Sequence, residues 1–178
     1  MERMTTQKSD KPTIDRGHVA MMPANAKAGQ VVGLVEITGG LGPLMDTAKL
    51  AEELGADLTV LLPALDAGEM LGLVKRMNDQ VTLTDFGLKF QKTAKKKIRL
   101  LKDQLSKIEP FTTALQLLTK KNAVTTAEIA EALSKSRIRW NHDNELNESL
   151  IRTILINWAI FAGLLSYDGR TNEFRKVQ

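Results

Sequence analysis

The sequence of 178 residues contains no cysteine and only two histidines, His18 and His142. Without cysteine, the chain forms neither a disulfide framework nor a cysteine-bearing zinc site. Two histidines leave little material for metal binding or general-base chemistry, and no nucleophile motif accompanies His142 and its neighbour Asp143. We therefore expect a protein that is not an enzyme and that holds no metal or cofactor.

The sequence also lacks a long apolar run, because charged residues interrupt every candidate for a membrane-spanning stretch of about 18 residues. Its N-terminus contains no apolar core of a signal peptide. Hydrophobic residues make up 43% of the chain and charged residues 26%, the balance of an ordinary globular protein. These features predict a cytoplasmic protein without membrane insertion, built from one domain or two small ones.

The formal net charge of +4 conceals an uneven distribution of acids and bases along the chain. Residues 41–73 hold six acids and one base, whereas residues 92–107 hold seven bases and one acid. Two such segments are complementary to each other and to partners of opposite charge. The sequence therefore favours a protein that recognises a partner by charge over one that catalyses a reaction.

Local signals divide the first part of the chain into a tail and two helices. Residues 1–29 carry prolines and glycines without periodicity and are expected to form a flexible tail. Helical spacing begins at Gln30. Asp46 is a predicted N-cap of the next helix, and Gly55 is its predicted stop.

A further helix and a hairpin complete the first unit. Asp57 is suited to cap the helix, but Pro63 would then lie in its interior, so we expect the helix to start nearer Leu61. Residues 73–77 and 80–83 then alternate as two short strands around a turn. Helix, turn, helix and hairpin is the order of a winged helix-turn-helix.

The same order recurs in the second half, after a long helix that Thr84 caps and that is expected to exceed twenty residues. There, Thr125 opens a helix, and an apolar helix over 148–163 precedes a closing hairpin. The predicted fold is mainly α with small β-hairpins, as two tandem winged helix-turn-helix units joined by a long basic helix. The expected boundaries are a flexible tail over 1–29, a first unit over 30–91, a basic bridging helix over 92–108 and a second unit over 109–178.

Several segments together resemble one known module: Val32–Glu36, Leu50–Gly55, Asp57–Leu58, Leu61–Pro63, Glu69–Gly72 and Leu83–Gly87. They are similar to the AAA-associated C-terminal domain, which usually follows the ATP-binding subunit of nitrate/sulfonate/taurine-type ABC importers. The resemblance extends from about Ala24 to Phe174. The sequence contains no G-x-x-x-x-G-K-[ST] phosphate loop, and we expect no ATPase ahead of the module. The resemblance therefore implies a noncatalytic regulatory or interaction module that associates with an ABC-type ATP-binding subunit in another chain.

Two groups of bases and one apolar stripe are the candidate contact residues. On a continuous helix, five bases spaced by three or four share one face and would meet nucleic acid or an acidic partner: Lys92, Lys95, Lys96, Arg99 and Lys102. A second basic group precedes the apolar helix: Lys135, Arg137 and Arg139. The apolar helix itself offers a candidate protein interface: Ile151, Leu155 and Trp158.

The main alternative function is a DNA-binding winged-helix transcription regulator that uses the two basic groups. Its weakness lies in the predicted recognition helix, Asp57–Leu71, which carries three acids and no base and would repel phosphates. A homodimer through the long helix, and a basic face that is merely solvated, are also compatible with the pattern.

Overall fold

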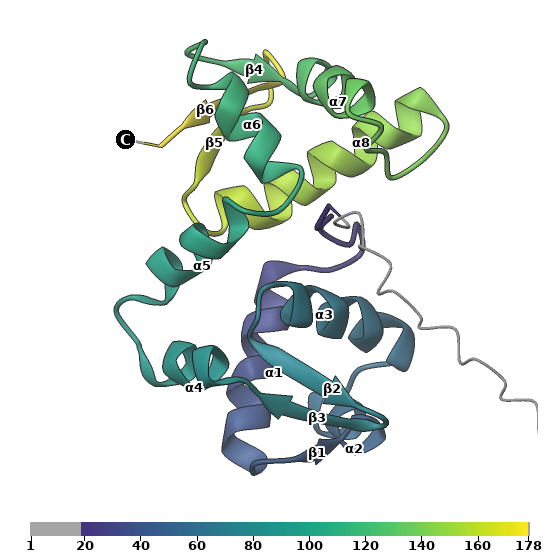
Figure 1. Ribbon diagram of the computed structural model, residues 1–178, viewed down its shortest axis with the longest axis vertical. Coiled ribbons are helices and arrows are strands. Elements are labelled where there is room, and N and C mark those ends of the chain that lie inside the picture. Colours follow the sequence, from purple (N-terminus) through teal and green to yellow (C-terminus); the bar gives the residue numbers. More distant parts are fainter. Residues whose placement is uncertain (1–18, 178) are drawn as a thin grey trace, which may run out of the picture.

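The computed structural model describes residues 19–177, and the chain is mainly helical with two small antiparallel sheets (Figure 1). This bears out the predicted mainly α class with small hairpins. Two units lie one above the other in Figure 1, and α5 (Lys97–Leu105) lies between them at one side. In this part of the chain, no helix is both long and apolar enough to cross a membrane.

The lower unit of Figure 1 places helices around a three-stranded sheet. Its elements are α1 (Ala28–Leu41), β1 (Met45–Asp46), α2 (Thr47–Leu54), α3 (Leu58–Met70), β2 (Val74–Met77) and β3 (Gln80–Leu83). After these elements, α4 (Asp85–Lys92) packs beside α1. The strand order is β1-β3-β2, with Val74 paired to Leu83 and Met45 to Val81. The predicted hairpin is confirmed, and β1 joins it as a third strand of only two residues, too short to show as alternation in the sequence.

The upper unit repeats this order. Its elements are α6 (Phe111–Leu117), β4 (Val124–Thr125), α7 (Thr126–Lys135), α8 (Asn144–Ile154), the π-helical segment η1 (Leu155–Ile160), β5 (Leu165–Asp168) and β6 (Glu173–Lys176). Its sheet has the order β4-β6-β5, which corresponds strand for strand to the lower sheet. The recurrence that the sequence suggested is therefore present in the topology of both halves.

Side-chain caps set the start of several helices. The Asp46 carboxylate accepts hydrogen bonds from the backbone N–H groups of Ala48 and Lys49, at 2.9 and 3.2 Å, and so caps α2 as predicted. Gly55 ends that helix in the left-handed conformation, with φ 56°. The Thr125 cap is also confirmed, since Thr125 and Glu128 form a reciprocal capping box at the start of α7.

The start of α3 corrects one prediction. The helix begins at Leu58, directly after Asp57, whose carboxylate accepts from the Thr59 backbone N–H at 2.8 Å. Pro63 lies inside the helix, so a start near Leu61 is wrong. Pro63 donates no hydrogen bond to the carbonyl of Thr59, but Thr59 is exposed and that carbonyl remains open to water.

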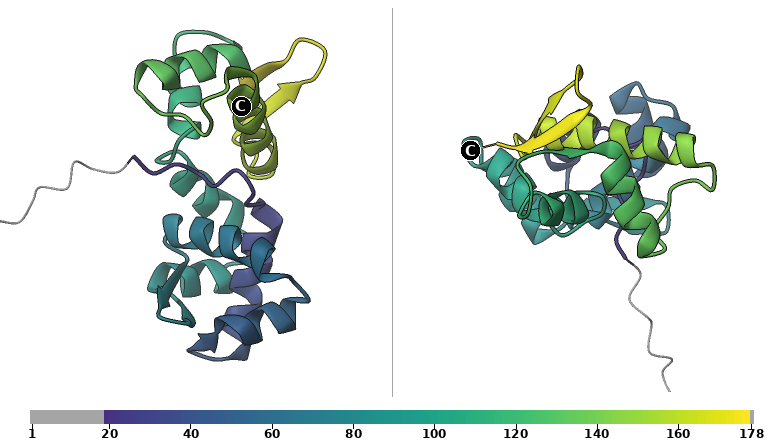
Figure 2. Two further views of the ribbon diagram at one scale, coloured as in Figure 1. Left: turned by 90° about the vertical axis from the view of Figure 1, so that its right-hand side faces the viewer. Right: turned by 90° about the horizontal axis from the view of Figure 1, so that it is seen from above.

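The predicted tail over 1–29 is also wrong for its described part, residues 19–29. Met22 and Ala26 are fully buried, and α1 begins at Ala28 rather than Gln30. Figure 2 shows this segment passing between the two units before it enters α1. Residues 1–18, including His18, lie outside the described residues.

Hydrogen bonds attach the N-terminal segment to the upper unit. The Met22 backbone N–H donates to the Glu109 carbonyl at 2.9 Å. The indole N–H groups of Trp140 and Trp158 donate to the carbonyls of Met22 and Ala26, at 2.8 and 2.9 Å. These partners lie more than a hundred residues apart in sequence, so no local pattern could reveal them.

The long basic helix is the third correction. The chain forms α4 (Asp85–Lys92) and then α5, and residues 93–96 between them are not helical. Thr93 is extended and its hydroxyl donates to the Lys89 carbonyl at 2.7 Å, which ends α4. Residue Phe90 of α4 is buried in the core, while α5 buries Leu101 and Leu105 further along, so a bend replaces the predicted straight helix.

Candidate functional site

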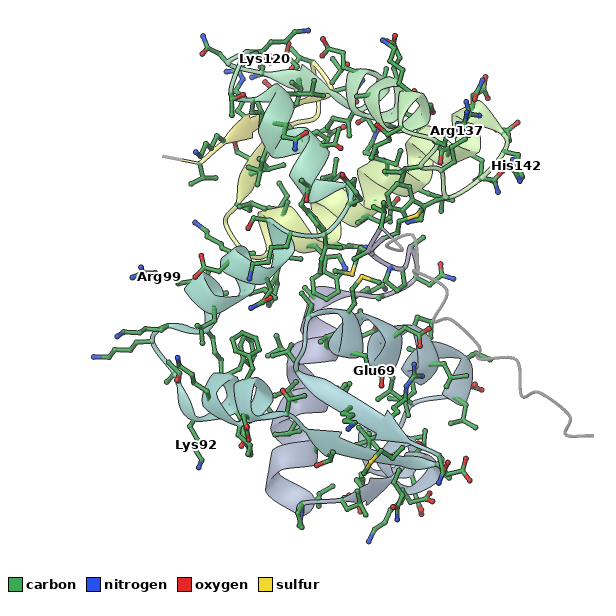
Figure 3. The ribbon with its side chains drawn as sticks, viewed as in Figure 1. Glu69, Lys92, Arg99, Lys120, Arg137 and His142 are labelled. Carbon is green, nitrogen blue, oxygen red and sulfur yellow. The ribbon has the colours of Figure 1, made fainter. Side chains whose placement is uncertain are left out.

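The bend between α4 and α5 forms a surface that we call the basic elbow, defined by Lys92, Lys95, Lys96 and Arg99. All four side chains are exposed, and none forms an ion pair with another described residue. Figure 3 shows Lys92 and Arg99 pointing outward on the same side of the molecule. The elbow therefore offers concentrated positive charge at an outer edge.

Lys102 does not belong to the elbow, which corrects the prediction that it shares one helical face with the other four bases; Lys97, which was not part of that predicted face, lies outside the elbow as well. Lys102 is half-buried, and its side chain lies beside Gly163 after η1. Lys97 forms an ion pair with Glu36 on α1, and its ammonium lies 5.8 Å from the centre of the Phe90 ring. Lys97 thus holds α5 against the lower unit.

The second basic group lies at the far end of the upper unit. Lys135, Arg137 and Arg139 are all exposed, but Lys135 pairs with Glu131 at 2.8 Å. The Arg139 guanidinium donates to the Asn144 side chain at 3.2 Å. In Figure 3, Arg137 and Arg99 lie on opposite sides of the molecule, so the structure does not bring the two basic groups together.

The predicted apolar interface is wrong. Ile151, Leu155 and Trp158 are each fully buried and form the core of the upper unit. The helix is apolar on more than one side, and its exposed apolar residues are Ile156, Ile160 and Phe161, which we call the η1 patch. Sequence periodicity could not tell the buried side from the exposed one, because both sides carry apolar residues one turn apart.

A groove on the lower unit was not predicted. It has a volume of about 520 Å³ and lies between the start of α2, the start of α3 and the β2–β3 turn. We call it the acidic groove, and its lining consists of Asp46, Thr47, Ala48, Leu58, Leu62, Arg76, Asn78 and Asp79. The Asp79 carbonyl accepts from both the backbone N–H and the hydroxyl of Thr47, each at 2.8 Å, which fixes two of its walls together.

Arg76 is a basic residue in the lining of this groove, and two carboxylates compensate its positive charge. Its guanidinium lies 2.6 Å from a carboxylate oxygen of Asp66 and 2.6 Å from one of Glu69. Burial would raise the pKa of Glu69, but hydrogen bonds from the Arg76 side chain and backbone outweigh this and lower that pKa. The carboxylates of Asp46 and Asp79 therefore make the electrostatic potential of the groove negative.

Other chemistry finds little support in the described residues. His142 lies exposed in the loop before α8, while the neighbouring Asp143 carboxylate caps that helix by accepting from the Leu146 backbone N–H at 2.8 Å. Among residues 19–177, no three His, Asp or Glu side chains converge to hold a metal ion.

The sequence matches one protein-family model, described as the C-terminal AAA-associated domain, over residues 48–168. The chain belongs to this family. The matched segment of this AAA-associated domain runs from α2 to the end of β5 and includes both the basic elbow and the η1 patch. No curated protein and no solved structure matches the chain.

The family match confirms the resemblance that the sequence suggested. It begins within α2, so α1 and the N-terminal segment lie before the matched part of the AAA-associated domain. The acidic groove spans this limit, since Asp46 and Thr47 precede it and the rest of the lining lies within it.

Proposed function

We propose that this AAA-associated domain is a noncatalytic regulatory or interaction module that docks onto an ABC-type ATP-binding subunit in another chain. The family match over residues 48–168 carries the proposal, because the family is described as an AAA-associated domain, and the resemblance noted in the sequence extends this to ABC-type ATP-binding subunits. The chemistry of ATP hydrolysis would then belong to the partner. The AAA-associated domain would contribute contacts alone.

We propose further that each half is a winged helix-turn-helix unit. The order of helix, short strand, two helices and hairpin supports this, together with the matching strand orders of the two sheets. In this assignment, α3 and α8 take the place of recognition helices.

The η1 patch and the basic elbow are the contact surfaces that we assign to this docking. The patch exposes two isoleucines and a phenylalanine within six residues of one helical segment, and burial of such groups against a partner is favourable. The elbow supplies four exposed bases that form no ion pair within residues 19–177, and these would attract an acidic surface and orient the encounter.

The structure does not favour DNA binding as a second function. Leu62 and Asp66 are exposed and lie one helical turn apart on α3, and this helix contains no Lys or Arg. Counterion release requires Lys or Arg at the surface that meets phosphates. The two basic groups are separated, so neither supplies an extended basic face.

Co-purification tests the proposal. The affinity-tagged full chain, isolated from its native cells, is expected to retain an ABC-type ATP-binding subunit identified by mass spectrometry. Ile160→Glu and the pair Lys95→Glu with Lys96→Glu are each expected to reduce its recovery at least tenfold. The pair Lys120→Glu with Lys176→Glu changes two exposed bases elsewhere and serves as the matched control. Failure to recover any such subunit, or ATP hydrolysis by the purified chain alone, would contradict the proposal.

A further inference from the structure

We infer that the acidic groove is a docking site for a basic amphipathic helix of a partner protein. The occupant would carry lysines or arginines beside apolar residues spaced one helical turn apart. This site lies on the lower unit and uses neither the η1 patch nor the basic elbow, so it stands independently of docking onto an ATP-binding subunit.

The floor of the groove is apolar and open to solvent. Leu58 and Leu62 lie one turn apart on α3 and are 47% and 46% exposed, whereas Leu61 and Leu65 of the same helix are buried in the core. Exposed leucines that line a concave surface gain free energy when a partner removes them from water.

The walls are fixed before any partner arrives. Thr47 ties the first turn of α2 to the β2–β3 turn through its two hydrogen bonds to the Asp79 carbonyl. Asp46 and Asp57 cap the two helices whose starts border the groove. A groove held in place in this way loses little conformational entropy on binding.

Charge selects the class of occupant. Asp46 and Asp79 line the groove, and the positive charge of Arg76 is already matched by Asp66 and Glu69. The surface therefore repels phosphates and anionic lipid and attracts a cationic partner. The leucine floor requires that partner to be apolar as well, and an amphipathic helix combines both properties.

The geometry also fits the size of such a partner. A volume of about 520 Å³ is within the range of side-chain and small-ligand pockets, so the groove holds the apolar anchors of a helix rather than a whole domain. Basic residues on either side of these anchors would reach the two aspartates.

Fluorescence anisotropy of a labelled probe tests the inference with the full chain. The probe is a 16-residue helical peptide of lysine and leucine with its leucines on one face. Two comparison peptides carry glutamate in place of lysine, or serine in place of leucine. We expect saturable binding of the first peptide, and at least tenfold weaker binding of each comparison peptide.

Variants of the groove locate the binding. Leu58→Ser with Leu62→Ser is expected to weaken it at least tenfold, while the equally exposed pair Leu41→Ser with Leu44→Ser changes it less than twofold. Asp46→Asn with Asp79→Asn keeps the α2 cap, because asparagine caps as well as aspartate, and should weaken binding several-fold at low salt. Glu52→Gln with Glu53→Gln is the charge-matched control outside the groove lining.

Three results would overturn the inference. The first is unchanged binding in the groove variants, and the second is an equal loss in the control pairs. The third is self-association in sedimentation that Leu58→Ser with Leu62→Ser abolishes, because a second copy would then be the occupant. If the serine pair lowers the melting temperature, Leu58→Ala with Leu62→Ala repeats the test.

Discussion

At the scale of single residues, close backbone approaches decide which positions tolerate change. Thr84 caps α4 by accepting from the Gly87 backbone N–H at 2.9 Å, and its own N–H donates to the Leu73 carbonyl at 3.1 Å. This brings α4 onto the turn that precedes β2. A Cβ at Gly87 would lie 1.9 Å from the Leu73 carbonyl oxygen, so only glycine fits there.

Gly87→Ala is therefore expected to destabilise the protein despite the better helix propensity of alanine. The clash involves backbone on both sides, and overpacking of this kind costs about 1–3 kcal/mol or more. We expect a drop in melting temperature of roughly 2–12 °C, measured by circular dichroism. Gly40→Ala, in α1 with open space around its Cβ position, is the control and should be neutral or slightly stabilising.

Glu69 gives the stability of the protein a predictable dependence on pH. Hydrogen bonds from Arg76 lower its pKa in the folded state below the ordinary value for a glutamate, so the folded state binds fewer protons than the unfolded state in that region. The resulting stability is present above about pH 5 and is lost as the pH falls through the folded-state pKa.

Glu69→Gln should reveal this contribution. The Glu69 side chain is one-third exposed, so its ion pair with Arg76 contributes about 1 kcal/mol at most to the free energy of unfolding. The variant should therefore melt roughly 1–3 °C lower at pH 7. The difference from the unmodified protein should shrink towards pH 3. Glu52→Gln, an exposed residue of α2, should show no such convergence, and a constant difference in Glu69→Gln would contradict the assignment.

At the scale of elements, the sequence predicted the features that depend on neighbouring residues, but not those that depend on contacts between residues far apart in the chain. The caps at Asp46 and Thr125 and both hairpins were predicted correctly, because their partners lie within a few residues. The break after Lys92 was missed because the apolar spacing continues across it, although α4 and α5 pack in different places. The candidate interface at Trp158 failed because an amphipathic stripe does not say which of its sides is buried.

The N-terminal segment gives the clearest test at this scale. Trp158 is fully buried and donates its indole N–H to the Ala26 carbonyl, so Trp158→Phe would leave that buried carbonyl without a donor. Loss of the bond and of ring volume should cost about 2–4 kcal/mol, measured by urea unfolding. Trp140→Phe removes the analogous bond from a partly exposed ring and should cost less, and equal losses would contradict this account.

At the scale of the whole molecule, the same segment joins the two units. Met22 and Ala26 are buried, their carbonyls accept hydrogen bonds from Trp140 and Trp158 of the upper unit, and the chain continues directly into α1 of the lower one. The Lys97–Glu36 ion pair adds a second connection, from α5 to α1. Neither connection would be expected from a flexible tail and a straight helix. The two units are therefore expected to unfold together.

Two optical probes can test this coupling, because both tryptophans, Trp140 and Trp158, lie in the upper unit, whereas far-ultraviolet circular dichroism reports on both units. In urea, we expect the fluorescence and dichroism transitions of the unmodified chain to coincide. Met22→Ala removes a buried side chain at the junction and should cost about 2–5 kcal/mol. If the junction couples the units, the two transitions should separate in this variant but not in the surface variant Val19→Ala. Separate transitions in the unmodified chain would instead mean that each unit folds on its own, and that the segment is anchored without transmitting stability.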